Sequence, residues 1–196
     1  LTSVLMMGSA VSATGAVALA FQSNEAPWAA FLSGCVIAVF AFIRYKHEIL
    51  HIGAYGFLFV TGLMILGKVL GVDPDQSALY PIYWVALGSI WIYFSFARKV
   101  DITLGYLIGV ATLFISTQFL FLSNHHAMSY LVALASASLM VVIFLNDRRW
   151  PLLVGTVAIT TFTVGEFVAE TLGGSLGALI GLLAAGIALI TSSLIA

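Results

Sequence analysis

A five-residue segment in the first third of the chain has the residue types and spacing of a zinc-binding motif. It reads H-E-I-L-H from His47 to His51, so on a helix the two histidines would share one face. Histidine is a common zinc ligand, and Glu48 beside the metal could act as general base toward a metal-bound water. Asp101 or Asp147 could supply a third ligand. The segment therefore allows a zinc hydrolase site, with an interfacial polar cluster as the interpretation that we prefer.

These five residues resemble the core motif of site-2-type intramembrane metalloproteases. The resemblance implies zinc as the cofactor, both histidines as its ligands and the glutamate as base. That family also carries a later phrase of the Asn-Pro-x-Asp-Gly type, whereas here Asn146 and Asp147 are followed by Arg148. Because this departure leaves the third ligand in doubt, we interpret the match as coincidental and expect no metal or other cofactor.

Two acidic residues late in the chain form the second candidate site. Glu166 and Glu170 are four residues apart within an apolar run, so a helix would place both on one face. Carboxylates at membrane depth are costly, and they usually face a bundle interior or a wet cavity. Lys68 is expected at a similar depth and could pair with Glu166. The three residues predict either a structural ion pair or a site that binds a proton or cation during transport.

Other polar residues interrupt the apolar runs. Gln118 lies inside one run, where a buried amide is expected to find a partner on another helix. His125 and His126 lie between two runs, and we interpret them as a solvated turn. The polar residues thus add one expected interhelical contact but no complete catalytic set, and we do not predict an enzyme.

The composition places all of these residues in a membrane protein. The chain has 196 residues, of which 62% are hydrophobic and 8% charged, and its mean hydropathy is +1.13. Soluble domains carry about 25% charged residues, so a water-soluble enzyme is excluded. The net charge of -1 gives no basic field for nucleic acid, and Cys35 alone cannot form an internal disulfide. The lipid bilayer is therefore the expected partner.

The apolar runs predict an all-α, polytopic transmembrane bundle of about eight spans, since a spanning helix needs roughly 20 apolar residues. The chain is expected to form one transmembrane domain over residues 1–196. Short joints would make consecutive helices antiparallel neighbours. The expected spans are 3–21, 28–43, 49–71, 80–97, 102–123, 127–145, 151–170 and 176–196.

Basic residues set the expected orientation. Six of the seven lie in the second, fourth and sixth joints, as the pairs Arg44 and Lys46, Arg98 and Lys99, and Arg148 and Arg149. With eight spans these joints share one side, which the positive-inside rule makes cytoplasmic. Both termini are then expected in the cytoplasm. A soluble domain before Leu1 remains an open alternative.

A weak internal repeat follows the same joints. Lys46, Arg98 and Arg148 are each followed seven residues later by glycine, at Gly53, Gly105 and Gly155. The starts are about 50 residues apart, which is typical of a duplicated helical hairpin. Such hairpin repeats, with a Gly-Ala-Leu-rich last span, resemble a group of uncharacterised bacterial multi-pass membrane proteins. The resemblance implies a bacterial plasma (inner) membrane and gives no site residues.

The last predicted span could contact another membrane subunit. Gly177, Gly181 and Ala185 are four residues apart and form a stripe of small residues along one helix face. Small residues allow close helix packing in lipid.

Three functions stay open on the sequence. The first, which we prefer, is a non-catalytic accessory, anchoring or assembly subunit. The second is a transporter of a small solute, proton or cation that uses Glu166, Glu170 and Lys68. The third is the zinc hydrolase.

Overall fold

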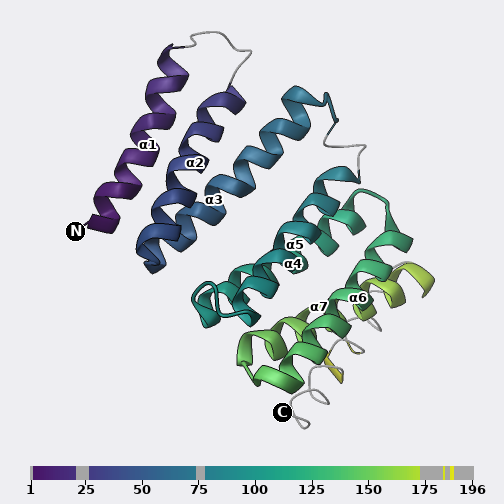
Figure 1. Cartoon of the computed structure of the whole chain (residues 1–196). Helices are drawn as coiled ribbons and strands as arrows, with labels where there is room; N and C mark the ends of the chain where they lie inside the picture. The colour runs from purple at the N-terminus through teal and green to yellow at the C-terminus, as the bar shows by residue number, and fades with distance from the viewer. Residues whose placement is uncertain (1, 21–26, 74–77, 173–182, 184–185, 188–196) are drawn as a thin grey trace. The chain divides into compact units, whose positions relative to one another are not determined.

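Helices account for most of the residues that the computed structural model describes, which are 2–20, 27–73, 78–172, 183 and 186–187. Within these residues the protein is all-α, with seven α-helices joined by short connections (Figure 1). They are α1 (Thr2–Ala20), α2 (Pro27–Tyr45), α3 (Glu48–Met64), α4 (Leu79–Phe96), α5 (Ile102–Leu122), α6 (His126–Asp147) and α7 (Trp150–Leu172). Helix α3 continues into a π-helical turn, η1 (Ile65–Val69).

The helix bounds follow the predicted spans closely. Among the described residues, five helices are long and apolar enough to cross a membrane: α3 with η1, and α4 to α7. In α2 the apolar segment Ala29–Tyr45 is shorter. The all-α prediction is confirmed, as is the expectation of several apolar helices of spanning length. The eighth predicted span, 176–196, lies almost entirely outside the described residues and stays a prediction.

The chain divides into two compact units, Leu1–Tyr83 and Trp84–Ala196. In the first unit α1 packs antiparallel to α2, and α2 antiparallel to α3, while α1 also contacts α3 (Figure 1). The start of α4 also contacts α3. The Tyr83 hydroxyl donates a hydrogen bond of 2.6 Å to the Leu58 carbonyl. The predicted single transmembrane domain concerns both units together and stays a prediction.

The second unit has a continuous apolar core between the remainder of α4 and helices α5, α6 and α7. Its buried members come from all four helices: Ile92, Tyr106, Val110, Leu113, Ala133, Met140, Leu152 and Ile159. Many large apolar side chains on the other helix faces are exposed, such as Leu131 at 69% and Val142 at 59%. An exterior of this kind is expected where lipid, not water, surrounds the helices.

Glycine allows α4 and α5 to approach closely. A Cβ atom at Gly88 would lie 3.0 Å from the Gly109 carbonyl oxygen, and one at Gly109 would lie 2.9 Å from the Gly88 carbonyl oxygen. The two backbones are therefore in direct contact, as small residues permit between helices in lipid.

The three basic joints share a backbone feature that the sequence did not predict. Lys46, Arg98 and Arg148 all have positive φ, at 47°, 54° and 50°. Each follows the end of a helix, where a left-handed residue satisfies the last carbonyl groups. Glycine or asparagine usually occupies this position, as Gly71 and Asn124 do after η1 and α5. Lysine and arginine are thus held where glycine, which has no Cβ atom, would be less strained.

The repeated glycines also share a structural role. A Cβ atom at Gly53 would overlap Met7 of α1, one at Gly105 would overlap Ser95 of α4, and one at Gly155 would overlap Val110 of α5. Each glycine therefore lies where another helix, or its side chain, comes close. The weak sequence repeat corresponds to a recurring unit: a left-handed basic residue, then a helix that makes a tight contact two turns later.

Candidate functional site

Helices α5, α6 and α7 bring five polar side chains to the end of the second unit that is opposite to Arg98 and Arg148. We call this group the carboxylate cluster. Its members are Gln118 of α5, His126 and Tyr130 of α6, and Glu166 and Glu170 of α7. Helices α6 and α7 are antiparallel neighbours, so the first turn of α6 lies beside the last turn of α7. This brings the side chains of the group together.

Glu170 lies at the centre of the direct contacts. The Tyr130 hydroxyl donates a hydrogen bond of 2.5 Å to Glu170 Oε2, and His126 Nδ1 lies 3.5 Å from the same oxygen. The His126 side chain is 32% exposed and that of Glu170 is 45% exposed. The carboxylate is therefore held by neighbours on α6 while it remains accessible.

Aromatic rings fix the two α6 side chains in place. Phe121 meets the His126 ring edge to face, with ring centroids 4.7 Å apart. Phe167 meets the Tyr130 ring in the same way at 5.7 Å. Such pairs add to stability beyond the area that they bury, so His126 and Tyr130 are positioned by packing as well as by Glu170.

Glu166 lies one turn deeper on α7 and is half-buried. Gln118 and His126 lie close enough to influence its carboxyl group. Glu166 Oε2 and Gln118 Nε2 are both buried, and although the two side chains lie next to each other, neither atom reaches full hydrogen-bond geometry with a group in the described part of the chain. A buried polar atom without a partner is costly, so this position favours a bound proton, ion or polar ligand group.

Lys68, the expected partner of Glu166, belongs to the first unit. It is exposed on the π-helical turn η1, next to Val69 and Leu70, which are exposed too. The two residues lie in different units, and their pairing stays a prediction.

The two histidines of the H-E-x-x-H segment have different surroundings. His47 precedes α3 in an extended conformation, and its Nδ1 accepts a hydrogen bond of 3.3 Å from the Ile49 backbone N–H. It is an exposed cap at the start of the helix. His51 is buried and stacks on Phe42 of α2, with ring centroids 5.3 Å apart. One histidine therefore caps a helix and the other packs between helices.

The two aspartates that could complete a zinc site also have structural partners. Asp101 accepts a hydrogen bond of 2.7 Å from the Leu104 N–H and caps α5. Asp147 accepts one of 2.8 Å from the buried Tyr106 hydroxyl. Among the residues that the structure describes, no three His, Cys, Asp or Glu side chains are grouped as metal ligands. The zinc site stays a prediction from the motif alone.

Sequence reasoning identified Glu166 and Glu170 as a pair but did not join them to Gln118, His126 or Tyr130. One signal was present, since His126 and Tyr130 are four residues apart on one helix and therefore share a face. Which helix that face meets depends on helix rotation and packing. Apolar runs that are hydrophobic on every side carry little information about either.

A comparison of the chain with protein-family models, curated proteins and solved structures finds no match. The resemblance to bacterial multi-pass proteins and the bacterial inner-membrane location stay predictions. So does the subunit contact through Gly177, Gly181 and Ala185, which lie outside the described residues.

Proposed function

We propose that this multi-pass membrane protein transports a small solute, proton or cation, and that the carboxylate cluster binds the transported or coupling ion. The observation that carries the proposal is the contact of Tyr130 and His126 with Glu170, one helical turn from Glu166. Three helices build the group, so a shift of one helix would change the contacts of the carboxylates.

The chemistry of the cluster suits a proton or a cation. Two carboxylates near each other are unfavourable in a medium of low dielectric constant unless a positive charge or a proton accompanies them. His126 can supply that charge only when protonated, and it lies 3.5 Å from Glu170. A cluster with this composition can therefore exchange a proton or cation with the aqueous phase beside it.

Flux through the purified protein in liposomes tests this proposal. The assay would follow protons, sodium and potassium in separate experiments. We expect flux above that of protein-free liposomes for at least one ion. Glu166→Gln and Glu170→Gln should each lower it by about tenfold or more, since a hydrogen bond to a charged group is worth about 1.5–3 kcal/mol.

The matched control is Glu48→Gln, which makes the same change at an exposed position outside the cluster. It should leave the flux unchanged. No flux for any of the three ions, or equal flux in the cluster variants and the control, would contradict transport of these ions by the cluster.

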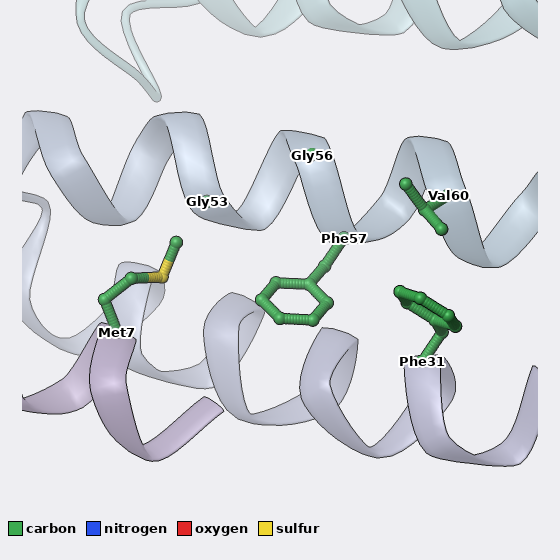
Figure 2. A pocket seen from close by; sticks show the side chains of 6 residues that line it. All are labelled: Met7, Phe31, Gly53, Gly56, Phe57 and Val60. Atoms are coloured by element: carbon green, nitrogen blue, oxygen red, sulfur yellow. The ribbon is translucent and has the colours of Figure 1, made fainter. Parts of the chain in front are cut away.

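An accessory or anchoring subunit is the second candidate, and a groove in the first unit favours it. The groove is apolar, encloses about 280 Å³ and is lined by Met7, Phe31, Gly53, Gly56, Phe57 and Val60 (Figure 2). Within the described residues, a Cβ atom at Gly56 would meet nothing within 4 Å. An exposed glycine in an apolar groove suits close contact with a helix of another protein.

Isolation of the protein from native membranes in a mild detergent tests the subunit function. A stoichiometric partner that is retained by the natural chain and lost in Gly56→Leu would support it. Val36→Leu, at a 62% exposed position on α2 outside the groove, is the control. Ion flux by the protein alone, with no partner in the preparation, would favour transport instead.

A further inference from the structure

A second groove runs between α6 and α7 in the second unit. It encloses about 160 Å³. Its lining includes Tyr130, Ala133, Leu134 and Ala137 from α6, and Thr160 and Thr163 from α7. Pockets for drug-sized ligands enclose about 300–1,000 Å³, so this groove suits a single thin chain rather than a bulky molecule.

The groove opens toward the surroundings of the helices. Of the residues that line it, Ala133 is buried, whereas Leu134 is 68% exposed. Thr160 is exposed as well. Because α6 and α7 have the length and hydropathy of membrane spans, the open side faces lipid in a bilayer. A ligand would therefore enter from the membrane.

Tyr130 connects this groove to the carboxylate cluster. Its side chain lines the groove, and its hydroxyl donates the hydrogen bond to Glu170. Glu170 and Thr160 are ten residues apart on α7, which corresponds to roughly 15 Å along the helix axis. The structure thus connects an apolar groove, through Tyr130, to a group of two carboxylates and one histidine.

From this arrangement we infer that the site binds a membrane-dissolved amphiphile with one apolar chain and an amine head. The chain lies between α6 and α7, and the ammonium group lies beside Glu170. The inference rests on the proposed function and names its substrate class. Charge selects the head, since the two carboxylates repel an anionic head and give a neutral head no ion pair.

Photo-crosslinking tests the inference without depending on flux. The probe is dodecylamine that carries a diazirine in the middle of its chain, and the reference is the dodecanol analogue with the same diazirine. The full-length protein is reconstituted in phosphatidylcholine vesicles, and labelled peptides are identified by mass spectrometry. We expect the amine to label the groove segments 133–137 and 159–164 several-fold more than the alcohol does.

Three variants locate the two parts of the site. Glu170→Gln should remove the preference for the amine, because it removes the charge beside Tyr130. Ala137→Leu should reduce labelling by filling the groove. Ala135→Leu is the matched control, because Ala135 is exposed on the same helix and does not line the groove. If Ala137→Leu does not fold, the amine-to-alcohol ratio in the natural chain and in Glu170→Gln still decides.

Equal labelling by the two probes, or labelling spread evenly over the exposed faces of α6 and α7, would overturn the inference. Ion flux without selective labelling would agree with the transport proposal, but it would rule out an amine amphiphile as the ligand of this site. Selective labelling without flux of ions or of the amine would support the amphiphile site and contradict the transport proposal. The protein would then have a binding site but would not transport.

Discussion

Tyr106 joins α5 to the end of α6 through one hydrogen bond and provides a prediction at the scale of a single residue. Its side chain is fully buried, and its hydroxyl donates to Asp147. We expect Tyr106→Phe to lower the free energy of unfolding by about 1–3 kcal/mol, since the bond has a charged acceptor. Tyr93→Phe, at a 63% exposed tyrosine of α4, should change the free energy of unfolding by less than about 0.5 kcal/mol.

Unfolding in mixed detergent micelles measures both variants. An equal effect of the two would show that the contact with Asp147 contributes nothing to stability.

The backbone at the basic joints gives a second residue-scale prediction. Arg148 has a left-handed conformation, which costs a residue with a Cβ atom about 1–2 kcal/mol relative to glycine. We expect Arg148→Gly to be more stable than Arg148→Ala by about 1 kcal/mol, since both variants remove the charge and only one removes the strain. Equal stability of the two would contradict the strain that we assign to this position.

At the scale of single residues, the sequence predicted which side chains share a helix face better than it predicted which side chains they contact. Glu166 and Glu170 were recognised as a pair because helical spacing is a local property. Tyr130 was missed because it meets Glu170 across two helices, and packing decides that contact. The H-E-x-x-H match illustrates the same limit, since His47 precedes the helix that the motif requires.

Among the helices, the sequence predicted most of the bounds within about two residues, because prolines, glycines and charges mark the ends of apolar runs. The order of contacts within each unit followed from the short joints. Two features did not follow: the π-helical turn after α3 and the division into two units. Each depends on interactions between helices rather than on the composition of one.

The contact of Gly109 with α4 provides a prediction at the scale of helix packing. A methyl group there would overlap Ile92 and approach the Gly88 carbonyl oxygen at 2.9 Å, so α4 and α5 would have to separate. We expect Gly109→Ala to lower the free energy of unfolding by about 1–3 kcal/mol, the usual cost of overpacking. Gly56→Ala is the control, because a methyl group at Gly56 meets nothing within 4 Å among the described residues.

A thermal unfolding series in the same detergent compares the two alanine variants. Loss of stability in Gly56→Ala alone would contradict the packing described for α4 and α5.

For the whole molecule, the joints differ by charge as well as by position. Helices α2, α4 and α6 are followed by left-handed Lys46, Arg98 and Arg148, whereas η1 and α5 are followed by left-handed Gly71 and Asn124. Helix ending alone does not require a basic residue, since glycine and asparagine serve equally well. Basic residues at these joints agree with the orientation that the positive-inside rule predicts, with the basic joints in the cytoplasm, and this orientation stays a prediction.

Cysteine accessibility in intact cells tests the membrane arrangement most directly. In a Cys35→Ala background, single cysteines would replace Glu48, Lys99 and Arg149 at the basic joints, and Asp73 and Asn124 at the others. A membrane-impermeant maleimide added outside should label Asp73→Cys and Asn124→Cys, and should label the other three only after the membrane is permeabilised. Labelling of both classes from the same side, or recovery of the protein in the soluble fraction, would contradict the account.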